Sequence, residues 1–341
     1  MRLTLSFEAP CRVAVREEPL AAPAAGQVAV ETLVSAISPG TEMLVYRGQV
    51  PAGMPVDAAI PSLAGGFAFP LAYGYAAVGR VVELGDGVAP EWRDRLVFAF
   101  HPHASHFLAA PDDLFPVPEG LAPEAAALLP NAETAVNFLM DGQPIVGERV
   151  VVFGQGVVGL LTTALLARMP LASLLTVDRH PLRRQRSVDF GAHAALDPEA
   201  PGALDGLSAS ADLTYELSGS PAALEQAIAA TGFGGRVVIG SWYGDKRVSL
   251  DLGGAFHRSR IQLVSSQVST IAPRFSARWS KDRRLEAAWR LLAELPLDGL
   301  VTHRFAFTEA PAAYELLDRR PEEAVQVVLT YRSQGSRSSS A

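Results

Sequence analysis

The spacing of apolar positions changes along the chain and divides it into two kinds of structure. Up to about residue 125, short apolar runs separated by Gly and Pro predict strands, as over 12–15, 27–35, 76–84 and 95–100. From residue 148 to about 267, short β-branched runs alternate with longer stretches that have one apolar face. That alternation is typical of an α/β protein with a doubly wound parallel sheet.

The expected elements follow from these runs. In the alternating part we expect strands at 150–153, 174–177, 213–217, 236–240 and 261–264. Helices are expected there at 157–168, 181–190 and 221–230. An Ala-rich helix is expected ahead of them, at 123–139. After them we expect a helix at 282–295, a strand at 301–307, a helix at 309–318 with Thr308 as its N-cap, and a strand at 324–331.

This order of elements predicts the domains. A β-rich domain comprises residues 1–130, and the returning β–α–β segment at 268–332 rejoins it. Residues 131–267 form the α/β domain. The Ser-rich tail at 333–341 is expected to be disordered.

The most informative motif is a glycine-rich turn between the first strand of the α/β domain and its helix. The turn reads Gly154-Gln155-Gly156-Val157-Val158-Gly159, and Asp178 ends the next strand, about 20 residues further on. The first glycine allows a tight turn, the second lets a pyrophosphate approach the backbone, and the third allows close packing of helix and strand. The motif in this context predicts a dinucleotide site.

The residues around the turn bear on the choice of cofactor. A carboxylate at position 178 accepts hydrogen bonds from ribose hydroxyls and repels a 2′-phosphate, which favours NAD. The neighbouring Arg179, His180 and Arg183 are suited to a phosphate, so NADP remains an alternative. Ligands of such sheets gather at the carboxyl ends of strands, so three residues in later loops are further candidates for cofactor contact: Ser218, Gly240 and Trp242.

Composition narrows the class of protein. The 341 residues are 49% hydrophobic and 19% charged, as in a globular protein, and the net charge of −7 argues against binding nucleic acid or an anionic membrane. Cys11 is the single cysteine, so no disulfide forms within the chain. Neither a signal peptide nor an apolar run of membrane-spanning length is recognised, so we expect a cytoplasmic protein.

Several segments resemble the medium-chain dehydrogenase/reductase superfamily, the alcohol-dehydrogenase-like enzymes. They are SAISPGTEMLVYRG at 35–48, GYAAVGRVV at 74–82, the glycine-rich unit, and GGRVVIGSW at 234–242. The runs at 38–42, 101–103 and 131–135 are most similar to the zinc-less branch that includes bacteriochlorophyllide a dehydrogenase. The resemblance implies a Rossmann domain, a β-rich GroES-like catalytic domain and NAD(P)(H)-dependent oxidoreductase activity on a small molecule. It also implies nicotinamide contact by Thr134, and a homodimer formed through an edge strand at 261–270.

The sequence departs from the superfamily at its metal stations. Where relatives place zinc ligands, this chain has Ser38-Pro39, Gly74-Tyr75-Ala76 and Pro130-Asn131, and the four-cysteine structural lobe is missing. We therefore expect neither family zinc, because tight sites need S, N or O ligands in a closed set. The remaining metal-like cluster is the trio His101, His103 and His106, in which 101 and 103 would share one face of a strand. A polar wall or a surface strand end is the favoured interpretation of that trio.

Without zinc, a side chain must stabilise or protonate the substrate oxygen. Four residues are catalytic candidates: Thr41 at the position of the family's proton relay, Tyr75 in place of a zinc-binding histidine, His101, and Glu133 beside Thr134. The candidates for substrate contact are Tyr46, His103 and Tyr243. A structural hydrogen bond is an equally good interpretation for each catalytic candidate, and for Glu133 a helix-start carboxylate is slightly favoured. Glu42, which holds a zinc-bound histidine in relatives, is expected to bond Tyr75 or the backbone.

Three functions fit these observations. The favoured one is a zinc-independent NAD(P)(H) oxidoreductase acting on an alcohol or carbonyl substrate. The glycine-rich loop at 65–70 and the pair Trp242-Tyr243 suggest that the substrate is bulky or flat. The alternatives are an NADPH-dependent C=C reductase of the quinone or enoyl type, and a non-catalytic nucleotide-binding relative.

Overall fold

The chain folds into two compact units, each described here by itself. The structure is a computed structural model that describes residues 1–51, 53–54 and 66–331. The first unit comprises Met1–Pro130 and Leu297–Ala341, and the second comprises Asn131–Pro296. Residue 65 of the loop singled out above, and the tail at 333–341, lie outside the described residues.

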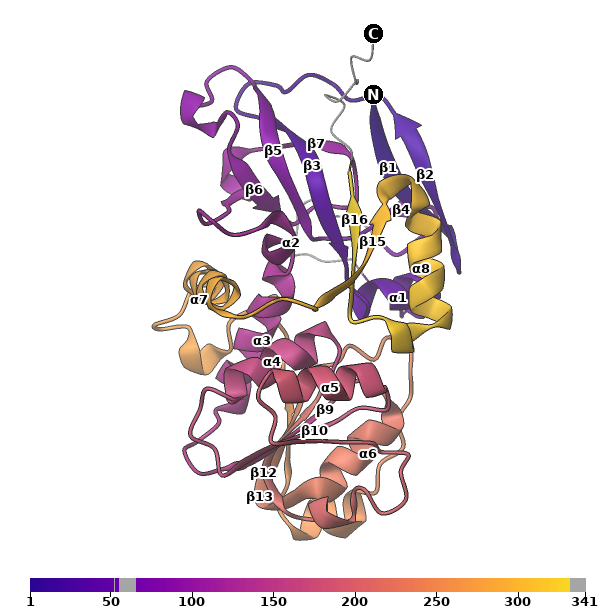
Figure 1. Cartoon of the computed structure of the whole chain (residues 1–341), viewed down its shortest axis with the longest axis vertical. Coiled ribbons are helices and arrows are strands. Elements are labelled where there is room, and N and C mark those ends of the chain that lie inside the picture. Colours follow the sequence, from indigo (N-terminus) through magenta and orange to yellow (C-terminus); the bar gives the residue numbers. More distant parts are fainter. Residues whose placement is uncertain (52, 55–65, 332–341) are drawn as a thin grey trace. The chain divides into compact units, whose positions relative to one another are not determined.

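The first unit is built mainly from strands (Figure 1). Its strands are β1 (Arg2–Ala9), β2 (Arg12–Glu18), β3 (Val28–Ile37), β4 (Leu71–Ala72), β5 (Ala77–Leu84), β6 (Leu96–Ala99), β7 (His106–Ala109), β8 (Phe115–Pro116), β15 (Val301–Ala306) and β16 (Gln326–Thr330). Its helices are α1 (Thr41–Tyr46), α2 (Pro123–Ala126) and α8 (Ala310–Arg319).

The long strand β3 holds this unit together. One sheet has the order β15-β16-β3-β5-β6-β8, with β7 also paired to β3, and a smaller sheet has the order β2-β1-β4. The C-terminal strand β16 runs antiparallel to β3, with Val328 opposite Ala36 (Figure 1). Strands β15 and β16 therefore extend the sheet that contains β3 and β5.

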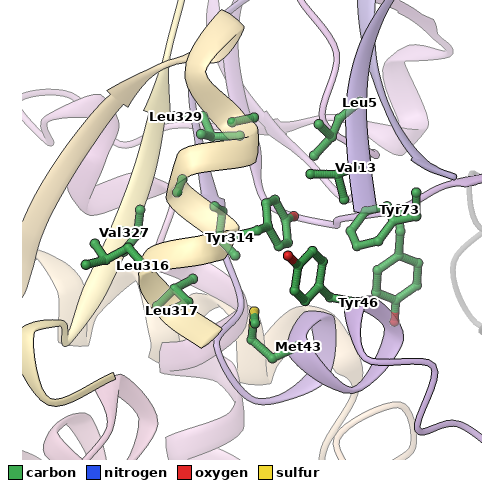
Figure 2. Packing of buried hydrophobic residues seen from close by; sticks show 14 of the residues in the cluster. Leu5, Val13, Met43, Tyr46, Tyr73, Tyr314, Leu316, Leu317, Val327 and Leu329 are labelled. Atoms are coloured by element: carbon green, nitrogen blue, oxygen red, sulfur yellow. The ribbon is translucent and has the colours of Figure 1, made fainter. Parts of the chain in front are cut away.

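The core beside the smaller sheet joins α1, α8 and β1. Tyr314 from α8 is fully buried, stacks on Tyr46 from α1 at a centroid distance of 5.5 Å, and meets Phe7 edge-on at 5.3 Å. Figure 2 shows the two tyrosines between Met43 and Val13. Aromatic contacts of this kind add to the gain from area burial, and they hold α1 in place against α8.

The second unit contains one parallel sheet with the order β11-β10-β9-β12-β13-β14. Its strands are β9 (Arg149–Phe153), β10 (Ser173–Val177), β11 (Ala194–Leu196), β12 (Ala211–Glu216), β13 (Thr231–Ile239) and β14 (Gln262–Ser265). Its helices are α3 (Leu129–Gly142), which begins at the end of the first unit, α4 (Val157–Leu166), α5 (Pro181–Asp189), α6 (Pro221–Ala230) and α7 (Lys281–Glu294) (Figure 1).

The winding of this sheet confirms the predicted α/β fold class. The chain starts at β9 in the middle, proceeds outward to β11, then returns to place β12 on the other side of β9. Residues 150–153 of β9 are buried, as expected of a strand covered on both faces. Strand β14 is the edge of the sheet, so pairing with a second copy through it stays a prediction.

Three details differ from the sequence-based expectations. The helix predicted over 123–139 is two helices, because Pro130 cannot continue a helix but suits the first turn of a new one. Thr308 is not an N-cap: residues Phe307–Glu309 form a 3₁₀ turn, and α8 starts after Glu309 without a side-chain cap. Strand β11 was not predicted, since its three residues are too short for a periodic signal.

A buried arginine explains why residues 268–296 pack with the second unit, although the sequence placed 268–332 with the first domain. Arg284 of α7 is fully buried. Its guanidinium donates to Glu133 Oε1 at 2.8 and 3.1 Å and to Asn137 Oδ1 at 2.6 Å, both on α3. It also donates to the backbone carbonyls of Val268 and Thr270. These bonds fasten α7 and the segment before it to α3.

Truncating this arginine should be costly. Arg284→Met leaves the buried Glu133 carboxylate without its cation, and we expect the free energy of unfolding to fall by about 3–5 kcal/mol. Arg290→Met on the same helix removes only an exposed pair with Glu286 and should cost less than about 0.5 kcal/mol. Urea unfolding followed by tryptophan fluorescence measures both. Equal losses for the two variants would show that the buried pair does not stabilise the unit.

Candidate cofactor and catalytic sites

The glycine turn in the second unit has the geometry its sequence predicts. Gly154 adopts φ +90°, and a Cβ there would lie 2.6 Å from the Ser218 nitrogen. A Cβ on Gly159 would lie 2.0 Å from the Gly154 carbonyl oxygen, so only glycine permits this contact between helix and turn. A Cβ on Gly156 would meet no atom within 4 Å. The backbone at Gly156 therefore faces open space, as a pyrophosphate site requires.

Helix α4 begins at Val157, directly after this turn. Its N-cap is Gly156, which supplies no side-chain hydrogen bond to the first turn. Helix N-termini carry amide donors and the positive end of the helix dipole, which together attract a phosphate. Because Val157 and Val158 stand in the first turn, their contribution to such a site is through the backbone. These residues fit the pyrophosphate of a dinucleotide.

Asp178 follows β10 and is linked to the glycine turn. Its Oδ2 accepts from the Gln155 amide at 2.7 Å and its Oδ1 accepts from the His180 amide at 2.8 Å. A carboxylate has about four acceptor positions, so capacity for ribose hydroxyls remains. Arg184, which the sequence reasoning missed, donates to the carbonyls of Asp178 and Arg179 and shapes this strand end. Arg179 is exposed there, and Arg183 lies on α5.

A buried carboxylate that sequence reasoning missed lies at the end of β12. Glu216 is fully buried. Its Oε1 accepts from the Ser218 amide, the Ser218 hydroxyl and the Gly219 amide, and its Oε2 accepts from the Tyr243 hydroxyl at 2.9 Å. Burial and the adjacent carboxylate raise the pKa of the Tyr243 phenol. The available signal was an acidic residue at the end of an otherwise apolar strand.

The cofactor candidates on β13 and α3 lie in tight surroundings. Gly240 follows β13, and a Cβ there would lie 2.3 Å from the ring of Phe138. Trp242, two residues later, is half-buried. Thr134 is half-buried on α3, and its neighbour Glu133 is paired with Arg284. Burial raises the pKa of Glu133 while the guanidinium opposes that shift. The ion pair gives Glu133 a structural role that neither sequence-based interpretation included.

In the first unit, Glu42 is the centre of a buried hydrogen-bond network. Its Oε1 accepts from the Ser38 amide at 2.7 Å. Its Oε2 bonds His103 Nε2 at 3.0 Å and accepts from the Tyr314 hydroxyl. The network continues from His103 Nδ1 to the Ser35 hydroxyl at 2.7 Å. Of the two partners expected for Glu42 from the sequence, the backbone is observed and Tyr75 is not. The side-chain partners of Glu42 are His103 and Tyr314.

Tyr75 instead donates to the Ser38 hydroxyl at 2.6 Å. Both residues are half-buried, and the Ser38 backbone is held by Glu42. The structure therefore brings together, as a pair of hydroxyl groups, the residues at two of the positions where relatives carry zinc ligands. Thr41 is half-buried at the start of α1.

The two histidines predicted to share a strand face do not lie in a strand. His103 is fully buried, and its ring packs so closely on Gly74 that a Cβ there would lie 2.5 Å from Cδ2. His101 stacks on Phe107 at 4.2 Å, and its Nδ1 donates to the Pro102 carbonyl. Burial lowers the pKa of His101 to about 4. The candidate substrate residue Tyr46 is also buried, with its ring stacked on Tyr314.

The donor chemistry at the metal stations does not suit zinc. The side chains there are a serine bonded to a tyrosine, an asparagine, an alanine and two prolines. Over the described residues, no group of three or more His, Cys, Asp or Glu side chains is placed to hold a metal ion. The same part of the chain contains no helix long and apolar enough to cross a membrane.

Comparison with known proteins finds similar dehydrogenases. The profile described as "Zinc-binding dehydrogenase" matches residues 157–286. The chain is 27% identical over 331 residues to 2-desacetyl-2-hydroxyethyl bacteriochlorophyllide A dehydrogenase of Rhodobacter capsulatus, over 91% of this chain and 92% of that one. The solved structure of 2R,3R-butanediol dehydrogenase from Bacillus subtilis matches with a TM-score of 0.78 at 18% identity, over 97% and 99% of the chains. The chain is thus similar to medium-chain dehydrogenases over most of its length.

A further solved structure shows the same fold with a nucleotide. An E. coli CFT073 protein described as a short chain alcohol dehydrogenase, in complex with NADH, matches with a TM-score of 0.76 at 17% identity, over 96% and 99% of the chains. The profile match begins at residue 157, after all three positions where relatives place zinc ligands. It therefore lies within the second unit and carries no information about metal ligands.

The half-buried His101, whose ring stacks on Phe107, should make stability depend on pH. Its pKa of about 4 in the folded chain lies below the unfolded value near 6.5, so the unfolded state binds the proton first. The stability that the neutral His101 ring contributes is therefore fully present above about pH 6.5 and is lost as the pH falls towards 4. Urea unfolding should show a loss between pH 7 and pH 5 that is larger for the wild type than for His101→Gln, by at most about 2 kcal/mol. Parallel losses in the two proteins would contradict the burial of a neutral ring.

Proposed function

We propose that this protein is a zinc-independent, NAD(H)-dependent oxidoreductase that interconverts an alcohol and a carbonyl compound. The proposal of nucleotide binding is supported mainly by Gly156, whose backbone faces open space. The neighbouring glycines, Gly154 and Gly159, instead lie in close contact with other backbone atoms. The preference for NAD rests on Asp178, whose carboxylate is fixed at the end of β10. When bound, the cofactor supplies or accepts the hydride.

The proton chemistry is assigned to side chains. We propose that Tyr75 and Ser38 act as the proton-donating pair, because their hydroxyls are bonded at 2.6 Å and both stay half-exposed. A carbonyl oxygen that gains negative charge takes a proton from one hydroxyl, and the other hydroxyl stabilises the oxygen that remains. The buried carboxylate of Glu42 holds the Ser38 backbone, and His103 behind it is too enclosed to touch a substrate in this structure.

The substrate proposal is a bulky or flat secondary alcohol. Trp242 is half-buried in the loop after β13, where flat molecules are expected to stack. The Rhodobacter capsulatus relative is named for a bacteriochlorophyllide that carries a hydroxyethyl group. A clear preference for NADPH in binding would instead favour the C=C reductase.

The glycine turn offers a direct test of nucleotide binding. Gly156→Ala adds a methyl group to open space, so we expect folding and thermal unfolding temperature to stay as in the wild type. The same methyl occupies the path of the pyrophosphate, so NADH affinity should fall by roughly 10-fold or more, as measured by NADH fluorescence titration. Wild-type protein that does not bind NADH, or a Gly156→Ala variant that binds it normally, would refute the proposed site.

The proton donor is tested on a panel of secondary alcohols. Tyr75→Phe should lower kcat by about 100-fold or more and flatten the pH profile, because general acid catalysis is worth that much. Tyr73→Phe is the matched control: it lies two residues away, is buried in the core, and should leave kcat within about twofold. If Tyr75→Phe turns over at the wild-type rate, the proton comes from another group.

A further inference from the structure

The buried carboxylate of Glu216 has no role in the proposed chemistry, and its surroundings are unusual for a structural residue. A fully buried carboxylate is costly unless its acceptor positions are filled. Here Oε1 accepts from the Ser218 amide at 2.8 Å, the Ser218 hydroxyl at 2.5 Å and the Gly219 amide at 3.0 Å, and Oε2 accepts from the Tyr243 hydroxyl at 2.9 Å. Every donor belongs to one of two loops that follow β12 and β13.

Other bonds tie these two loops together around Glu216. The Gly219 amide also donates to the Ser241 hydroxyl at 2.8 Å, and the Lys246 ammonium donates to the Gly219 carbonyl at 2.8 Å. The Gly240 amide donates to the backbone carbonyl of Glu216 at 3.0 Å. The loops after β12 and β13 are therefore a single hydrogen-bonded element with Glu216 at its centre.

This element packs directly against the glycine turn. A Cβ on Gly154 would lie 2.6 Å from the Ser218 nitrogen and 2.7 Å from the Leu217 carbonyl carbon. The Leu217 amide donates to the Phe153 carbonyl at 2.8 Å, at the end of β9. These contacts fix the position of the two loops relative to the glycine turn and therefore to the proposed pyrophosphate site.

The order of the strands in the sheet indicates which half of a bound cofactor would lie beside the two loops. Strand β10, which carries Asp178 at its end, lies on one side of β9, and β12 and β13 lie on the other. Dinucleotides bind across the carboxyl ends of the strands at this reversal of strand order, with the adenosine ribose at the acid after the second strand. The nicotinamide half then extends over the ends of β12 and β13.

We infer that Glu216 is a positioning residue for the nicotinamide half of the cofactor: it gathers the donors of the two loops and fixes the surface on which the nicotinamide lies. The inference rests on the proposed nucleotide function and adds a residue to it. Glu216 does not touch the cofactor, since it is enclosed by its four donors.

The test compares two ligands on one variant. Glu216→Gln keeps the volume and one accepting oxygen but removes the charge, so the loops lose their common acceptor. NADH, which carries the nicotinamide, should bind about 10-fold more weakly, measured by fluorescence titration. AMP, which occupies only the adenosine side, should bind within about twofold of the wild type by calorimetry. Glu225→Gln, an exposed glutamate on α6, is the matched control and should change neither affinity.

Each outcome decides the inference. Unchanged NADH affinity in Glu216→Gln would overturn it. Equal weakening of NADH binding and AMP binding would also overturn it, because that result indicates damage to the whole domain. Tyr243→Phe removes one donor and keeps the carboxylate, so this variant is used if Glu216→Gln does not fold. It should weaken the binding of NADH, and not that of AMP, by about threefold. Unchanged NADH affinity in Tyr243→Phe would overturn the inference. Wild-type protein that binds AMP but not NADH would instead refute the proposed function itself, and the inference with it.

Discussion

Buried carboxylates that collect donors from separate segments are the constraint on which both units of this protein depend. Glu42 joins the Ser38 backbone, His103 and Tyr314, and Glu216 joins the loops after β12 and β13. An ionised carboxylate is only an acceptor and is costly to bury alone, so each one forces its donors to converge. The same constraint that stabilises the fold thus fixes the loops that carry the candidate sites.

The local parts of this arrangement could be predicted from sequence. The glycine turn, Asp178 and the alternating strands leave signals within about 30 residues, and the structure places them as expected. The partners of the buried acids could not be predicted, because Tyr314 lies 272 residues from Glu42 and Arg284 lies 151 residues from Glu133. Such pairs have no local periodicity, and the break at Pro130 shows that even an Ala-rich helix depends on single residues.

Hydrogen bonds link the residues that stand where relatives carry zinc ligands. The resemblance to zinc enzymes implies that Glu42 corresponds to an acid that holds a zinc-bound histidine. In this chain Glu42 bonds the imidazole of His103, which comes from a different part of the sequence. Gly74 gives that ring its room, and Tyr75 beside it turns to Ser38. A glycine turn with the geometry of a dinucleotide site therefore stands in a chain that has Ser38, Tyr75 and Asn131, beside two prolines, at the positions where relatives carry zinc ligands.

We propose that NADH binds to this protein without zinc. Calorimetric titration of NADH into protein dialysed against a strong chelator, with zinc content measured on the same sample, separates nucleotide binding from metal binding. NADH should bind at an affinity that added zinc does not change, with substoichiometric zinc throughout. Stoichiometric zinc that survives dialysis, or NADH binding that appears only when zinc is restored, would show that the metal is part of the site.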